Sequence, residues 1–198
     1  MSFLTRKMSP TITDMIRFDH SHALLTFHQY TEDKSVATKT SLAETICTAL
    51  EIHATLEEEI FYPVLRQRGA DHAVLDKSVP EHDAMRRLIA DIRNTHASMP
   101  QHAELMHALM RDVMHHVADE ETVLLPQAEK LLSHAQLQEM GAQMTRRRLQ
   151  LVTPQAGKIA VNTVVGFSGS TMFRVAGALA CLLVIGTERH ESRRIDNQ

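Results

Sequence analysis

The chain of 198 residues has no tryptophan, only two tyrosines and only seven glycines, whereas Leu, Ala, Met and His are plentiful. Because aromatic residues favour strands while Leu, Ala and Met favour helices, this composition predicts a helical protein. The two cysteines, Cys47 and Cys181, lie far apart and make no disulfide framework, so we infer a reducing compartment. The N-terminus also lacks the continuous apolar core of a secretory signal, and we therefore expect a cytoplasmic protein.

Positive charge is scarce over most of the chain. Residues 1–145 contain 13 Lys and Arg against 21 Asp and Glu, whereas residues 146–198 contain eight against three. A nucleic-acid binder needs a basic face, so the first 145 residues do not resemble one.

The length of the chain fits one domain with a tail, and it is sufficient to bury a core without disulfides or metals.

Histidine is unusually frequent, with 13 in the chain, and its position is more informative than its number. His53 and Glu57 are four residues apart, so on a helix both side chains point the same way. His116 and Glu120 repeat this spacing 63 residues later, and in each copy a proline lies ten residues after the histidine. Two copies in register predict two facing helices that supply matched metal ligands.

The apolar periodicity predicts the helices that carry these residues. We expect helices over residues 10–30, 36–68, 80–97, 101–132 and 134–149, and leave residues 70–79 ambiguous. Pro63 and Pro126 should kink the second and fourth helices, because proline lacks an amide proton. His20 and His82 fall in the apolar stripes of the first and third helices, so both should face the core.

These helices form an internal repeat. Each half carries one histidine, followed 33 or 34 residues later by a His-x-x-x-Glu motif. If the helices are joined by short loops and pack antiparallel, the protein has an all-α fold. We expect an up-down four-helix bundle with a short fifth helix and a C-terminal apolar tail helix. Six residues would then converge in the bundle core: His20, His53, Glu57, His82, His116 and Glu120.

Four imidazoles and two carboxylates suit two first-row transition-metal ions. We expect two histidines on each ion, Glu57 and Glu120 as bridges, and open positions for oxygen species from solvent or substrate. A redox metal with an open position supports dioxygen or peroxide chemistry. Calcium and magnesium prefer oxygen ligands alone, and a single zinc ion would not need both halves. Without a metal or a partner, each buried carboxylate would be strongly destabilising.

Simpler interpretations of single residues remain open. A lone histidine in an apolar stripe is usually a core or boundary residue, and a lone His-x-x-x-Glu is usually an intrahelical pair. His115 with Asp119 competes with the corresponding pair one residue later. Glu58 and Glu121 are alternative ligands or acceptors for imidazole N–H groups. We expect the remaining histidines to lie mostly at the surface and the methionines to fill the core.

Residues 12–148 resemble the hemerythrin-like, or HHE cation-binding, family. The resemblance rests on these motifs: Asp19-His20, His53 with Glu57-Glu58 and Tyr62-Pro63, Glu81-His82, and His116 with Glu120-Glu121 and Leu125-Pro126. It implies a four-helix bundle around a non-haem di-iron centre, with two iron ions bridged by carboxylates and an oxygen species. The implied ligands are the same six residues. Family members bind dioxygen reversibly, sense oxygen, iron or nitric oxide, or act on iron and peroxide.

One position departs from the family pattern. The invertebrate oxygen carriers have a second histidine one turn after the third-helix ligand, where this chain has Arg86. One metal would therefore have one fewer imidazole, which implies a more open site and argues against reversible oxygen transport. Arg86 could place a positive charge near the site, but we expect its side chain to extend toward solvent.

The composition changes near residue 148. We divide the chain into a hemerythrin-like bundle, residues 1–148, and a linker with an apolar tail, residues 149–198. The apolar run 175–186 would be about 18 Å long as a helix, well short of the ~30 Å hydrocarbon core of a bilayer. We expect residues 171–187 to contact the bundle or a protein partner. Membrane association through this tail and a disordered or non-native terminus are the alternatives.

Three functions are consistent with these patterns. The leading hypothesis is a non-haem di-iron protein that binds or senses dioxygen or iron, with dioxygen, a related diatomic molecule or peroxide as its ligand. The second is a di-iron oxidoreductase acting on peroxide or nitric oxide. The third is a helical interaction scaffold without metal. The sequence leaves open whether the protein is an enzyme, and no nucleic-acid partner is expected.

Overall fold

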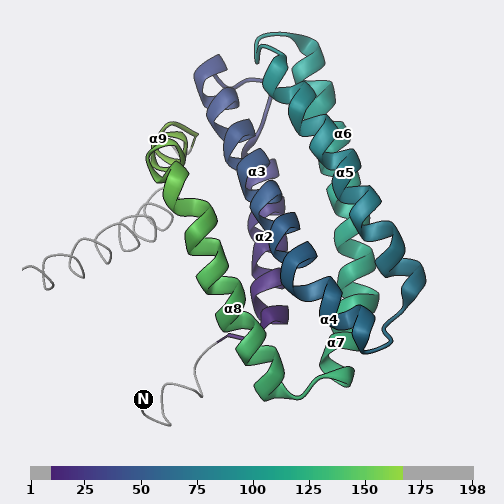
Figure 1. Cartoon of the computed structure of the whole chain (residues 1–198). Coiled ribbons are helices and arrows are strands. Elements are labelled where there is room, and N and C mark those ends of the chain that lie inside the picture. Colours follow the sequence, from purple (N-terminus) through teal and green to yellow (C-terminus); the bar gives the residue numbers. More distant parts are fainter. Residues whose placement is uncertain (1–9, 167–198) are drawn as a thin grey trace, which may run out of the picture.

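The computed structural model describes residues 10–166, which fold as an all-helical bundle. Four long helices form it: α2 (Ile12–Gln29), α3 (Val36–Leu56), α5 (His72–Asn94) and α6 (Pro100–Asp119). Successive helices run in opposite directions, and α2 contacts α3 and α6 while α5 contacts the same two helices (Figure 1). The predicted antiparallel four-helix bundle is therefore confirmed.

Polar side chains define where the helices begin. Thr11 caps α2 in a capping box with Asp14, and Ser35 caps α3 through the backbone N–H of Thr38. The third helix begins at His72, not at Pro80 as the sequence suggested, because the Asp71 carboxylate accepts from the backbone N–H groups of residues 73 and 74. Pro80 lies inside α5, where burial of the apolar Leu75 and Met85 on the same helix offsets the hydrogen bond that proline cannot make.

A π-helical turn precedes each of the two repeated prolines. The turn η1 (Glu57–Phe61) joins α3 to α4 (Tyr62–Gln67), and η2 (Glu120–Leu124) joins α6 to α7 (Leu125–Leu131). The backbone N–H of Tyr62 donates to the carbonyl of Glu57, five residues back, and Leu125 does the same to Glu120. The wider turn accommodates the proline ring, which would clash with a carbonyl in an α-helix. Each π turn begins at a predicted glutamate ligand.

The chain beyond the bundle is also helical up to its last described residue. Helix α8 (His134–Val152) crosses α2 and α3, and after η3 (Thr153–Gln155) the helix α9 (Ala156–Gly166) packs on α3 (Figure 1). Residues 149–166, expected as linker, thus comprise the end of α8, the turn η3 and the helix α9. At Gly141 a Cβ atom would lie 2.4 Å from the carbonyl oxygen of Pro10, so only glycine allows α8 to approach the start of α2 this closely.

The predicted localisation included membrane association through the tail as an alternative, and this alternative is wrong as far as a membrane-spanning helix is concerned. Within residues 10–166, no helix combines the length and apolar character needed to cross a membrane. The segment on which that prediction rested, residues 171–187, lies outside the described residues.

Two apolar clusters fill the bundle, one on each side of a polar layer. The first cluster surrounds η1, η2 and α8 and includes Ile16, Leu56, Phe61, Leu124 and Met144. The second cluster lies toward the α2–α3 and α5–α6 loops and includes Phe27, Ile46, Met85, Ile89 and Leu109. Along each long helix the chain passes from one cluster to the other, and the predicted metal ligands lie at the crossing point.

Candidate metal centre

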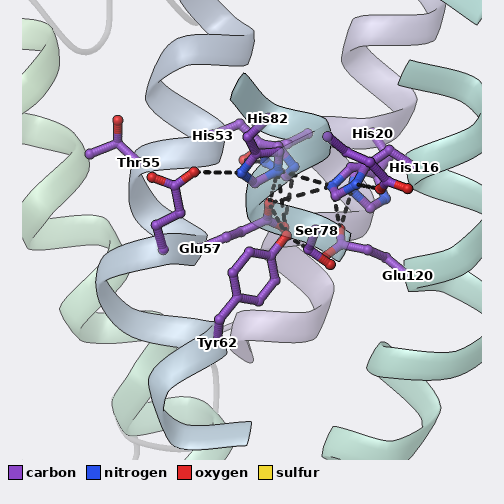
Figure 2. Close-up of polar contacts among 12 residues, drawn as sticks. His20, His53, Thr55, Glu57, Tyr62, Ser78, His82, His116 and Glu120 are labelled. Carbon is purple, nitrogen blue, oxygen red and sulfur yellow. Dashed lines mark hydrogen bonds and ion pairs between the residues drawn. The ribbon is translucent and has the colours of Figure 1, made fainter. Parts of the chain in front are cut away.

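The polar layer consists of the six residues that the repeat singled out, and all six are buried. Glu57 and Glu120 are fully buried, and no histidine of the set exceeds 8% exposure. Figure 2 shows the four imidazoles gathered at the two carboxylates, with the Tyr62 side chain reaching the same cluster from the neighbouring turn. Their potential ligand atoms form two groups that share one residue, Glu57.

The first group comprises His20, His53, Glu57 and Glu120, whose ligand atoms all lie within 4.8 Å of one another. His20 Nε2 is 3.2 Å from Glu120 Oε2, and His53 Nε2 is 3.2 Å from Glu57 Oε1. These four atoms are buried and have no hydrogen-bond partner in the described part of the chain. Buried polar atoms are rarely left in this state, so the arrangement fits a cation that would satisfy all four.

The second group comprises Glu57, His82 and His116. Glu57 Oε2 is 3.5 Å from His82 Nε2 and 4.0 Å from His116 Nε2, and the two Nε2 atoms are 3.1 Å apart. Each group therefore takes its two histidines from one half of the repeat. Glu57 has one oxygen toward each group, as a bridging carboxylate would.

The outward Nδ1 atom of each of the four histidines in the two groups contacts a carboxylate. His53 pairs with Asp19 at 3.2 Å and His116 with Glu81 at 2.9 Å, and these acceptors directly precede His20 and His82. In the other two pairs the acceptor is the residue directly after a candidate glutamate ligand. His82 pairs with Glu58 at 2.8 Å, and His20 pairs with Glu121 at 3.0 Å. An Nδ1–H that donates to a carboxylate leaves Nε2 free to bind metal and fixes the ring orientation.

This arrangement settles two alternatives from the sequence. Glu58 and Glu121 are acceptors for imidazole N–H groups and do not belong to either group of potential ligands. His115 is exposed, and Asp119 pairs with Lys77, so the competing pair points away from the centre. Among the histidines expected at the surface, His102 is instead buried and bonds to the Tyr30 hydroxyl at 2.7 Å.

Arg86 has a more specific role than the predicted extension to solvent. Its guanidinium makes two contacts of 2.9 Å with the Glu58 carboxylate, which in turn accepts from His82. Arg86 thereby holds the acceptor that orients a histidine. Within the described residues, the second group of potential ligands contains Glu57, His82 and His116 and no third imidazole.

Sequence reasoning missed four residues around the centre: Asp19, Glu81, Tyr62 and Arg148. The family motifs include Asp19 and Glu81 without predicting a role for them, although their matched position before His20 and His82 is a signal of one. The Tyr62 hydroxyl donates to Glu120 at 2.8 Å and to Glu57 at 3.2 Å. Arg148 pairs with Asp19 at 2.5 and 2.7 Å from α8, a long-range contact with no local sequence signal.

Electrostatics explain why the layer favours a cation. Burial, reinforced by the nearby charge of Glu120, raises the pKa of Glu57 well above its usual value. Burial opposes ionisation of Glu120 as well, but its contact with His20 and the charge of His116 lower its pKa overall. Burial, followed by the neighbouring His116, lowers the pKa of His82 to about 4. Two carboxylates buried in one layer are costly on their own, and a divalent ion offsets that cost.

The comparisons with known proteins agree with this geometry. The model of the hemerythrin HHE cation binding domain matches residues 11–128. A hemerythrin HHE cation-binding domain-containing protein from Mycobacterium kansasii has a similar crystal structure, with a TM-score of 0.64 and 17% sequence identity. The match covers 78% of this chain and 92% of that chain, and at this identity it shows the fold alone. A search of curated proteins finds no match to the chain.

Proposed function

The chain belongs to the hemerythrin HHE cation-binding family, and from this premise we propose that it holds two iron ions and uses them to bind or sense dioxygen or iron. The observation that carries the proposal is the shared carboxylate: Glu57 offers one oxygen to each of two groups that each contain two histidines. The proposed ligands are His20, His53, Glu57, His82, His116 and Glu120. Imidazole and carboxylate together suit iron better than they suit calcium or magnesium.

The protein's own residues prepare the site in three ways. Four carboxylates hold the imidazole rings with Nε2 inward. The two apolar clusters separate the layer from bulk water at both ends of the bundle. Tyr62 keeps a hydroxyl proton at the centre, because burial and the charges of Glu57 and Glu120 raise its pKa well above the usual value. Iron bound there would supply one-electron redox chemistry and a position for an oxygen ligand.

Optical spectroscopy of the iron-loaded protein tests the dioxygen function. The full chain is loaded with ferrous iron without oxygen, exposed to air, and then returned to argon and to dithionite. Oxygen binding or sensing predicts a visible absorption change that appears with air and is reversed by deoxygenation or reduction. Bound iron whose spectrum is unchanged by air would remove the dioxygen function while leaving the metal site in place.

A second candidate is an oxidoreductase acting on peroxide or nitric oxide, and Tyr62 is the observation that favours it. Its buried hydroxyl contacts both carboxylates and lies 3.4 Å from His82 Nε2, so it can deliver a proton or a hydrogen bond inside the centre. Peroxide consumption by the iron-loaded protein, lowered about 10²-fold or more in Tyr62→Phe, would support this function. Tyr30→Phe is the matched control, because Tyr30 bonds to His102 and does not contact the centre.

A further inference from the structure

A cavity of about 560 Å³ lies beside the metal centre, and its lining includes all four histidines of the site. It also reaches residues of α2, α3, α8 and α9, which come together on one side of the bundle (Figure 1). Sites for organic ligands of drug size occupy about 300–1,000 Å³, whereas one water molecule accounts for only ~30 Å³ of liquid. The cavity is therefore much larger than dioxygen, nitric oxide or peroxide requires.

The cavity wall is mainly apolar. Its apolar lining side chains include Ala23, Ala49, Leu50, Ile52, Met85, Ile89, Val113, Val152 and Ile159. Phe18 and Leu25 also line it and are 65% and 48% exposed, so the apolar surface continues to the outside of the protein. An apolar wall of this size is not expected to hold ordered water, and it suits an aliphatic chain.

One cationic group in the lining retains an unpaired donor. Arg148 Nη1 and Nη2 contact Asp19, but its Nε is buried without a hydrogen-bond partner in residues 10–166. The other carboxylates and guanidinium groups of the lining are paired: Arg86 with Glu58, Glu44 with Arg93 and Lys158, and Glu51 with Arg93. A carboxylate is the strongest acceptor for a guanidinium N–H, and a buried donor left unpaired is unfavourable.

From these features we propose that the cavity binds a medium-chain fatty acid. Its carboxylate pairs with the Arg148 guanidinium, which adjoins His53 through Asp19, and its alkyl chain extends from there along the apolar wall. The bound chain then occupies space through which small molecules reach the metal centre from this side. This inference goes beyond the proposed iron function and does not depend on the identity of the metal.

Calorimetric titration of the full chain with dodecanoate, below its micelle concentration, tests the site. We expect saturable binding of one molecule per chain, weakened at least about tenfold by Ala49→Phe, which fills the cavity from α3. Ala37→Phe, at an exposed position of the same helix, is the matched control and should bind like the wild type. No saturable binding by the wild type, or equal affinity in the two variants, would overturn the proposal.

A second pair of variants covers the case in which Ala49→Phe does not fold. Ile159→Asp places a charge on the cavity wall contributed by α9, whereas Val161→Asp places it at a position that is 62% exposed on the same helix. Only the first should weaken dodecanoate binding, again by at least about tenfold. Equal binding by both variants counts against the cavity as the site.

The head-group assignment has its own test. The wild type should prefer dodecanoate to dodecanol by roughly tenfold, and Arg148→Met should lose that preference while still binding the alkyl chain. Preference for dodecanoate retained in Arg148→Met would refute the role of Arg148. Each titration is made on metal-free and on iron-loaded protein with iron measured in parallel, so that failure of fatty-acid binding is distinguished from failure of the metal site.

Discussion

The two halves of the repeat, α2–α3 and α5–α6, build the same cage in the same way. In each half a carboxylate directly before the first histidine accepts from the second histidine, as Asp19 does from His53 and Glu81 from His116. In each half, the carboxylate directly after the candidate glutamate ligand accepts from a histidine of the other half: Glu58 accepts from His82, and Glu121 accepts from His20. The sequence repeat is therefore a repeat of the outer acceptors as well as of the inner residues.

The halves differ where the rest of the chain contacts them. Asp19 is held by two contacts from Arg148 of α8 and its side chain is 14% exposed. Glu81 is 32% exposed, and besides His116 the cation that pairs with it within residues 10–166 is Lys77, at 4.0 Å. Tyr62 follows η1, whereas the matched position after η2 is Leu125. We infer that α8 stabilises the α2–α3 side of the centre through Arg148. The Tyr62 hydroxyl comes from the same half and has no counterpart at the matched position of the other half.

Glu57→Gln should have the largest effect, because it removes the residue that both groups share. We expect bound iron to fall to near zero, a greater loss than the roughly 10–100-fold that accompanies removal of an outer hydrogen-bond acceptor. Elemental analysis after reconstitution and desalting measures this loss. Glu104→Gln, at an exposed position, is the control. Retention of two ions by Glu57→Gln would show that the carboxylate is not shared.

Asp19→Asn and Glu81→Gln compare the two halves directly. Both variants should weaken iron binding, by about 10–100-fold. Asp19→Asn should lie at the upper end of that range, because the change also leaves Arg148 partly unpaired in a less exposed site. Competition with a chelator of known affinity gives the two dissociation constants. Equal losses would mean that the support from α8 has no energetic consequence.

The pH dependence of the metal-free protein should reflect His82. The pKa of His82 is lowered to about 4 from an ordinary 6.5, first by burial and then by His116. Between these two pH values His82 is protonated in the unfolded chain but not in the folded chain. The free energy of unfolding therefore falls as pH drops from about 6.5 toward 4, by at most ~1.4 kcal/mol per pH unit. Urea unfolding at several pH values should show that the free energy of unfolding changes less steeply with pH in His82→Gln than in the wild type. His107→Gln, at an exposed position, should keep the wild-type slope, and an unchanged slope in His82→Gln would contradict the assignment.

Tyr62→Phe should have the smallest of these effects on the metal-free protein. Its hydroxyl donates to Glu120 and Glu57, and a hydrogen bond to a charged group contributes about 1.5–3 kcal/mol. Tyr30→Phe loses a bond to His102 and should cost only about 1 kcal/mol. Chemical unfolding of both variants measures the difference. Equal losses would indicate that Tyr62 is an ordinary core residue.

Much of the fold followed from local sequence. Helical periodicity and the spacing of His53 with Glu57 and of His116 with Glu120 were sufficient to predict the bundle and the six converging residues. The π turns were not predicted, because the two prolines indicated a disturbance of the helix but not its form. The start of α5 was misplaced because Pro80 looks like a first-turn proline, although the Asp71 cap and the burial of Leu75 outweigh that local signal.

What the sequence could not supply came from contacts between distant segments. Arg148 reaches Asp19 over 129 positions, and no periodicity links them. The cavity depends on how α8 and α9 lie against α2 and α3, and on residues that the sequence suggested were linker. Tertiary packing thus decides the features in which the two halves of the repeat differ.

Iron stoichiometry tests the central claim most directly. The full chain is reconstituted with ferrous iron without oxygen, desalted and analysed for iron per chain, beside His53→Ala and His82→Ala. The two-group arrangement predicts about two ions in the wild type, with each variant losing most strongly the ion of its own half. A wild-type protein that binds no iron or only one ion, or histidine variants that keep two ions, would contradict it.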